Sequence, residues 1–187
     1  SVNAGQSASI TVTATGTPPP ACQWRLNGTN IAGATTSTCT RSNVAPADAG
    51  SYSVVATNLA GSVTSSNAIL IVNVPPAITA QPQDVSVTVG SNATFFVTMT
   101  GTLPLSYQWQ FNGTDIADAT DSTFTRSAAQ TGDAGSYSAV VTNLAGSLVS
   151  SNATLTVNVP PAITAQPQSI TATAGSNVTF TVTAAGT

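Results

Sequence analysis

The stretch Asp-Ala-Gly-Ser-Tyr at residues 48–52 occurs again at residues 133–137, 85 residues later. The dipeptide Gln-Trp at 23–24 returns at 108–109 with the same offset, so no residue is inserted or lost between the copies. A period this regular indicates an array of one repeated unit. The unit is longer than a solenoid repeat and is large enough to have a hydrophobic core of its own.

A longer repeated stretch marks the junctions between copies. Val-Pro-Pro-Ala-Ile-Thr-Ala-Gln-Pro-Gln stands at 74–83 and again at 159–168. We therefore expect a repeat lacking its first strand at 1–74, a complete repeat at 75–159 and the opening strands of a third repeat at 160–187. Because both ends of the chain fall inside a repeat, we expect the array to continue beyond them.

The composition excludes several classes of function. The chain has no histidine, only three basic residues and six acidic ones, for a net charge of −3. All three basic residues are arginines, so a histidine-based triad or a lysine Schiff base cannot be built. No basic patch is available to neutralise phosphates, and no apolar run approaches the roughly 18 residues of a membrane helix. We expect no catalysis, no cofactor, no nucleic-acid partner and no membrane insertion in this segment.

The pattern of side chains favours strands throughout. Residues 93–100 and 106–111 alternate apolar and polar side chains, and the Asn-Gly turn at 112–113 follows directly. Threonine and valine are abundant, while the helix formers glutamate and lysine are absent. About seven short strands fit into one copy, which predicts an all-β fold of tandem β-sandwiches.

Two features of each copy resemble the immunoglobulin superfamily. Trp24 and Trp109 stand on the third predicted strand, and the Asp-Ala-Gly-Ser-Tyr motif comes before the sixth. The copies look most like the intermediate (I-set) type in its bacterial secreted form, which occurs as tandem arrays in surface proteins. The resemblance implies that both tryptophans pack in the core and that Tyr52 and Tyr137 form tyrosine corners. It also implies an extracellular or cell-surface location.

The cysteines depart from that family. Many immunoglobulin domains join their second and sixth strands by a disulfide, but neither copy has cysteines there. Instead, Cys22 and Cys39 replace Tyr107 and Phe124 of the second copy. Because both positions change together, we predict a Cys22–Cys39 disulfide between the third and fifth strands, worth about 3 kcal/mol. A bridge would imply an oxidising compartment, and the alternative is a pair of buried free thiols.

Two arginine–aspartate pairs also recur at the same offset. Arg41 precedes Asp48 by seven residues, as Arg126 precedes Asp133. Strand alternation points both arginines inward, where an unpaired charge would be costly. The family resemblance implies an ion pair across the bottom of each sandwich. The alternative is an arginine that reaches solvent at the rim.

One acidic cluster is a candidate metal site. Asp115, Asp118 and Asp121 follow one another at intervals of three in a loop, a spacing that could gather oxygen ligands for Ca²⁺. The spacing matches no calcium-loop motif, and the first copy has no acidic residue at these positions. We expect a solvated loop without metal.

The sequence thus favours a structural and adhesive role in an extracellular stalk or filament of immunoglobulin-like domains. Its partners would be the neighbouring repeats of the same chain or filament. One alternative is a module that binds a cell-surface protein or glycan, although aromatic residues make up only 5% of the chain. Another alternative is a spacer within a larger secreted enzyme.

Overall fold

The computed structural model describes residues 1–186, and Thr187, assigned above to the third repeat, lies outside them. The described residues form strands and short 3-10 helices, with no α-helix among them, which confirms the all-β prediction. They make two compact units. One unit is Ser1–Ala77 with the loops Thr100–Leu105 and Thr142–Ser147, and the other is Ile78–Met99, Ser106–Val141 and the described residues from Leu148 on.

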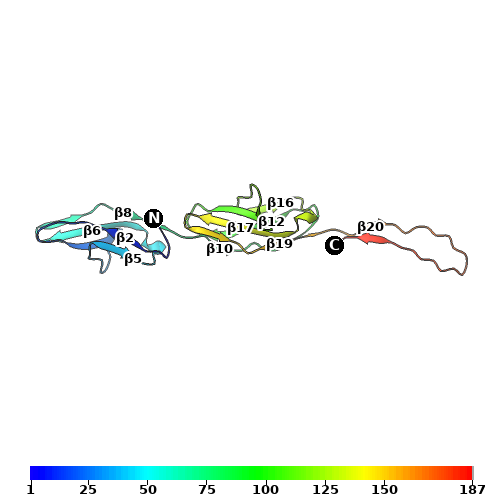
Figure 1. The fold of residues 1–187 in the computed structure, drawn as a ribbon, viewed down its shortest axis with the longest axis horizontal. Coiled ribbons are helices and arrows are strands. Elements are labelled where there is room, and N and C mark those ends of the chain that lie inside the picture. Colours follow the sequence, from blue (N-terminus) through cyan, green and yellow to red (C-terminus); the bar gives the residue numbers. More distant parts are fainter. Residues whose placement is uncertain (187) are drawn as a thin grey trace. The chain divides into compact units, whose positions relative to one another are not determined.

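The first repeat is a sandwich of short strands (Figure 1). Its elements are β1 (Val2–Asn3), β2 (Ala8–Thr11), β3 (Ala21–Leu26), β4 (Thr29–Asn30), β5 (Thr38–Arg41), η1 (Pro46–Asp48), β6 (Gly50–Asn58), β7 (Gly61–Thr64), β8 (Ala68–Leu70) and β9 (Val72–Asn73). One sheet has the order β4-β3-β6-β7, with β8 also paired to β6. β2 pairs with β5, and β1 runs parallel to β9.

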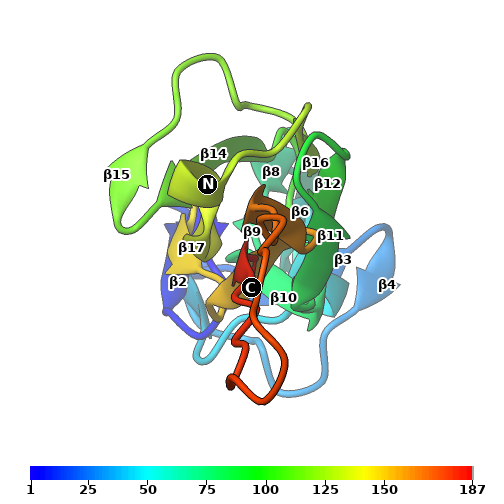
Figure 2. The ribbon, with the colours of Figure 1, turned by 90° about the vertical axis from the view of Figure 1, so that its right-hand side faces the viewer.

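The second repeat has the same plan. Its elements are β10 (Ala77–Ala80), β11 (Val85–Thr88), β12 (Ala93–Phe96), β13 (Thr98–Thr100), β14 (Ser106–Phe111), β15 (Thr114–Asp115), β16 (Thr123–Arg126), η2 (Thr131–Asp133), β17 (Gly135–Asn143), β18 (Gly146–Val149) and β19 (Ala153–Asn158). One sheet has the order β11-β19-β17-β14-β15, so that β15 lies at its edge (Figure 2). β12 pairs with β16, and β10 pairs with β13.

Each repeat surrounds its own hydrophobic core. In the second repeat, the core is aromatic: Phe95 stacks on Tyr137 at 4.7 Å between ring centroids, and Phe124 lies 6.2 Å from Trp109. In the first repeat, the buried cluster contains Trp24, Tyr52 and smaller side chains, with Cys39 at the position of Phe124. The strand registers agree, because Phe95 faces Phe124 just as Ile10 faces Cys39.

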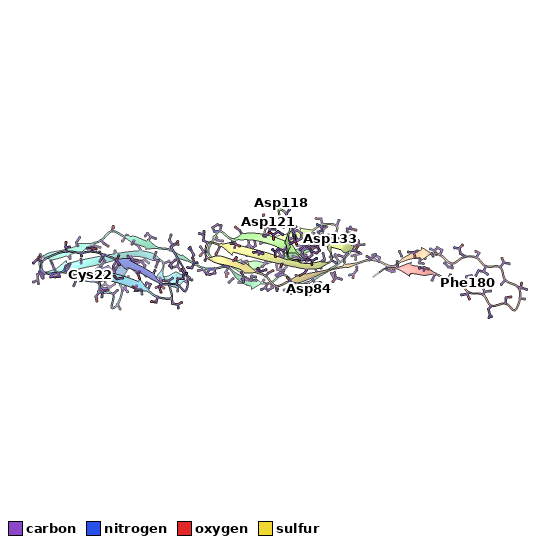
Figure 3. The ribbon with its side chains drawn as sticks, viewed as in Figure 1. Cys22, Asp84, Asp118, Asp121, Asp133 and Phe180 are labelled. Carbon is purple, nitrogen blue, oxygen red and sulfur yellow. The ribbon has the colours of Figure 1, made fainter. Side chains whose placement is uncertain are left out.

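The residues from 160 onward repeat the opening of a sandwich without its remainder. β20 (Ala162–Ala165) pairs with β21 (Thr183–Ala185) in an antiparallel hairpin, the counterpart of the pairing between β10 and β13. All the described side chains from 160 on are exposed. Phe180, labelled in Figure 3, is 65% exposed, whereas its counterpart Phe95 is 1% exposed. The hairpin therefore forms without a core of its own.

Candidate functional site

The two tryptophans lie at the centre of the cores. Trp24 on β3 is 2% exposed, and Trp109 on β14 is fully buried. Each indole N–H donates a hydrogen bond to a backbone carbonyl twelve residues later, at Thr36 in the first repeat and Asp121 in the second. Burying a polar N–H is tolerated only when it finds such a partner. The arrangement places both tryptophans as packing residues.

The tyrosines of the repeated motif close the turn that precedes them. Tyr52 on β6 donates its hydroxyl hydrogen to the carbonyl of Asp48 at 2.8 Å, and Tyr137 on β17 donates to the carbonyl of Asp133 at 2.9 Å. Both rings are buried. Because each bond spans four residues, it holds the short 3-10 turn against the strand that follows.

The structure brings each arginine to its aspartate. Arg41 Nε lies 3.8 Å from Asp48 Oδ1, and Arg126 Nη2 contacts Asp133 Oδ1. The arginines do not point into the core as strand alternation suggested: the two side chains are 30% and 47% exposed. Their long stems let the guanidinium groups reach the rim, so the ion pair and the rim position occur together.

The electrostatic consequence is clearest at Asp133. The hydrogen bond from Arg126 and then the backbone N–H of Gln130 hold the pKa of this carboxyl below its usual value. The same hydrogen bond raises the pKa of Arg126. Both shifts favour the charged forms of Arg126 and Asp133, as expected for an ion pair.

The predicted disulfide is not formed in the structure, where Cys22 and Cys39 are free thiols. Cys39 sits at the position of Phe124, whose ring contacts Trp109 and Tyr137 in the second repeat. Cys22 is two residues along β3 from Trp24, a shift of about 7 Å. Facing sheets lie about 10 Å apart, whereas a disulfide requires Cα atoms within about 7 Å. The separation of the sheets and the shift along β3 together explain why the two thiols are not bonded.

The two cysteines differ in environment. Cys39 is 4% exposed, and burial raises the pKa of its thiol, although Arg41 acts in the opposite direction. Cys22, labelled in Figure 3, is partly exposed. The pairing stays a prediction, and alkylation before reduction tests it, because bridged cysteines would take up no label.

The acidic loop does not gather into a metal site. Asp115 Oδ1 accepts a hydrogen bond from Gln110 at 2.7 Å, and the backbone carbonyl of Asp121 accepts from Trp109. Figure 3 labels Asp118 and Asp121 on the loop. Within residues 1–186, no group of three or more histidine, cysteine or acidic side chains could hold a metal ion.

A feature that the sequence only hinted at is the entry segment, residues 74–84, which lies along one face of the second repeat. The backbone of Val74 bonds Thr102 in both directions, at 2.7 Å to its hydroxyl and 3.0 Å from its N–H. Asn143 donates its side-chain amide to the carbonyls of both residues. At Gly101, with φ of +145°, a Cβ would come within 3.1 Å of the Pro75 carbonyl, so this approach requires glycine.

Further along, the entry segment is fixed by side-chain oxygens. Gln81 Oε1 accepts from the backbone and the hydroxyl of Ser151, at 2.9 and 3.2 Å. Asp84 Oδ1 accepts from the backbone N–H of Thr154 at 2.7 Å. Ile78, which precedes Gln81 on β10, packs against the core of the second repeat. β10 is thus an integral strand of the second repeat.

The corresponding face of the first repeat is an open groove. Its cavity volume is about 450 Å³. Its floor and walls include Val12, Thr13, Ala14, Val54 and Val63. Thr13 and Ala14 are the counterparts of residues in β13, the partner strand of β10. The groove is therefore the position that the entry segment occupies in the second repeat.

Comparison with known proteins agrees with this geometry. Residues 1–58 and 75–143 each match the family model described as an immunoglobulin domain. The chain belongs to the immunoglobulin domain family. None of the helices described in residues 1–186 is long and apolar enough to cross a membrane.

Curated relatives with similar sequences include Endoglucanase C and Roundabout homolog 1. Endoglucanase C of Cellulomonas fimi is 35% identical over 116 residues, which is 59% of this chain and 10% of that protein. Roundabout homolog 1 of Homo sapiens is 30% identical over 186 residues, 91% of this chain and 11% of that protein. The chain thus spans about a tenth of each of these two relatives.

Among solved structures, the I67–I69 fragment from the titin I-band has the same fold. The TM-score is 0.78 with 23% sequence identity, over 100% of this chain and 72% of that one. This likeness confirms tandem immunoglobulin β-sandwiches as the fold class.

Proposed function

We propose that this chain is a structural and adhesive segment of an extracellular array of immunoglobulin domains, forming a stalk or filament without catalysis. The observation that carries the proposal is the second repeat, in which the tryptophan, the tyrosine and the arginine–aspartate pair singled out from the sequence serve packing or turn closure. Trp109, Tyr137 and the Arg126–Asp133 pair are each engaged in holding the sandwich.

Surface chemistry supports the same role. Charged residues make up 5% of the chain, and threonine, serine and asparagine take the places that charges usually occupy. Such a surface is soluble and weakly interacting, which suits a spacer between distant points. The partners in this proposal are neighbouring repeats, and the location is extracellular or at the cell surface. The bacterial, intermediate-type assignment belongs to the proposal too, and the relative from Cellulomonas fimi supports its bacterial part.

Immunogold electron microscopy of intact, unpermeabilised source cells tests the proposal. Antibodies raised against this chain should label extended structures outside the cell, and pre-absorption with the purified chain should remove the label. Label that is restricted to the cell interior would contradict the proposal.

A second candidate is a spacer within a larger secreted enzyme, which the similarity to Endoglucanase C favours. Both candidates require the same non-catalytic sandwich. The other domains of the parent polypeptide therefore distinguish them. Mass spectrometry of the species that carries this chain should find only further repeats if the stalk proposal holds. A co-purifying glycoside hydrolase domain on the same polypeptide would favour the spacer.

A further inference from the structure

A cavity of about 250 Å³ lies in the second repeat, between the β14–β15 hairpin, β16, η2 and β17. Its lining residues all fall between positions 111 and 137, so the complete sandwich forms it alone. Pockets for drug-sized ligands usually measure about 300–1,000 Å³. This cavity therefore suits a smaller ligand, such as a short hydrocarbon chain or a single amino-acid side chain.

The walls of the cavity are aromatic. Phe111 and Phe124 are partly buried, and Tyr137 is 2% exposed. The Tyr137 ring lies 5.0 Å from the Phe111 ring and 5.9 Å from the Phe124 ring, measured between centroids. The backbone at Gly135 packs closely against Phe111, because a Cβ there would come within 2.7 Å of that ring. A ligand that enters between these rings must have an apolar body.

The mouth of the cavity carries a carboxylate. Asp115 on β15 is exposed, and its Oδ1 accepts a hydrogen bond from the neutral amide of Gln110 at 2.7 Å. The other two charged lining residues, Arg126 and Asp133, form an ion pair with each other. Residues 75–159 contain five aspartates and one arginine, so the whole second repeat is negative. The field at the mouth therefore favours a cation.

The first repeat has the opposite charge at the same place. There Arg25 Nε donates to Asn30 at 2.8 Å, so this hydrogen-bonded pair is positive, whereas the pair at 110 and 115 is negative. The walls differ as well, since Leu26 and Cys39 stand at the positions of the two phenylalanines. The combination of aromatic walls and an acidic mouth thus belongs to the second repeat, and the first repeat provides an internal control.

We propose that this cavity binds an apolar primary amine, with its hydrocarbon body among the three rings and its ammonium group on Asp115. The orientation follows from the burial of the rings and the exposure of the carboxylate, because an ammonium group deep in the cavity would lose its hydration. A free alkylamine and the amino terminus of a polypeptide with a bulky apolar first residue share this chemistry. The site goes beyond the proposed stalk role, which does not require it.

Two-dimensional NMR of the purified 187-residue chain tests the proposal, with isopentylamine as the probe. The amine should shift the backbone amide signals of residues 111–116 and 124–126. It should leave the corresponding signals of the first repeat, at 26–31 and 39–41, unchanged. Isopentanol has the same hydrocarbon body without the charge. It should bind about two- to fivefold more weakly, as expected for the loss of one exposed ion pair.

Three variants separate the mouth from the walls. Asp115→Asn gives the mouth the residue of the first repeat, and it should weaken amine binding about two- to fivefold without changing alcohol binding. Asp118→Asn removes the same charge from a loop residue outside the lining, so its amine binding should be unchanged. Phe111→Leu gives one wall the residue of the first repeat and should weaken both ligands. The Asp115 result does not depend on whether the wall variant folds.

The tripeptide Leu-Gly-Gly distinguishes the two sources of the amine. Shifts at the same residues with this peptide would identify a polypeptide terminus as the ligand, and shifts with isopentylamine alone would identify a small amine; either result supports the proposal. The absence of shifts with isopentylamine overturns it, as do equal shifts in both repeats. Equal binding of the amine and the alcohol, or equal weakening by Asp115→Asn and Asp118→Asn, also overturns it.

Discussion

The two repeats build one sandwich around different cores. At the facing pair of β12 and β16, the second repeat places Phe95 opposite Phe124, and the first repeat places Ile10 opposite Cys39 in the same register. Two large rings are thus exchanged for two smaller side chains without a change in strand pairing. The fold therefore does not depend on the combined volume of the two side chains at this facing pair.

The feature that both repeats share is a set of hydrogen bonds made by buried polar groups. Both repeats keep the tryptophan N–H bond to a carbonyl twelve residues later and the tyrosine hydroxyl bond to a carbonyl four residues earlier. Each bond also satisfies a group whose burial would otherwise be costly. The comparison indicates that these bonds define the frame, while the packing between them varies.

The largest expected effect is the loss of a central tryptophan. Trp109→Ala should lower the free energy of unfolding of the second repeat by about 3–5 kcal/mol, since it leaves a large cavity. Trp24→Ala should cost less in the first repeat, because Trp109 also makes ring contacts with Phe95 and Phe124, worth about 0.5–1.5 kcal/mol each. Urea unfolding gives the values, and hydrogen exchange by mass spectrometry assigns each to its repeat. Equal costs would argue against the contribution of the rings.

A smaller change would convert part of one core into the other. Phe124→Cys gives the second repeat the residue of the first, and should cost about 1–3 kcal/mol because the contacts with Trp109 and Tyr137 are lost. Thr123→Ser on the same strand, at an exposed position, is the control and should change little. An unchanged free energy of unfolding in Phe124→Cys would mean that the packing of this ring contributes little to the stability of the second repeat.

The sequence was informative about periodic features and less so about side-chain direction at strand ends. Alternation predicted the strands that carry Trp24 and Trp109, because burial on one face imposes a period of two. It pointed Arg41 and Arg126 inward, yet their flexible stems reach the rim. For Cys22 and Cys39, the sequence shows that both replace aromatic residues of the second copy. The distance between them, however, depends on the offset between two strands in different sheets, which the sequence does not reveal. The boundaries at 74 and 159 stay predictions.

Removal of the tyrosine hydroxyls should give a smaller difference in stability between the two repeats. Tyr137→Phe should cost about 0.5–1.5 kcal/mol, because the carbonyl of Asp133 loses its donor. Tyr52→Phe should cost somewhat more in the first repeat, since the Tyr52 oxygen also accepts a bond from Arg41 Nε at 3.4 Å. Thermal unfolding of the two variants provides the comparison. A larger loss in Tyr137→Phe would reverse the expected order.

The smallest expected effect is on the free energy of unfolding at low pH, and it tests the ion pair of the second repeat. The pKa of Asp133 lies below its ordinary value near 3.8, first because of the hydrogen bond from Arg126 and then because of the Gln130 N–H. A carboxylate with a lowered folded pKa stabilises the fold above the unfolded value and loses that contribution as pH falls through the folded one. The unfolding free energy should therefore decline below about pH 4.

The decline due to this pair should stay under about 1 kcal/mol, because the Arg126 side chain is 47% exposed and water screens the attraction. Asp133→Asn should remove this part of the acid sensitivity, while Asp118→Asn makes the same charge change on an exposed loop residue and should retain it. High salt should reduce the difference between the variants. Acid sensitivity in Asp133→Asn equal to that of the unmodified chain would show that the Arg126 pair adds nothing to the stability of the second repeat.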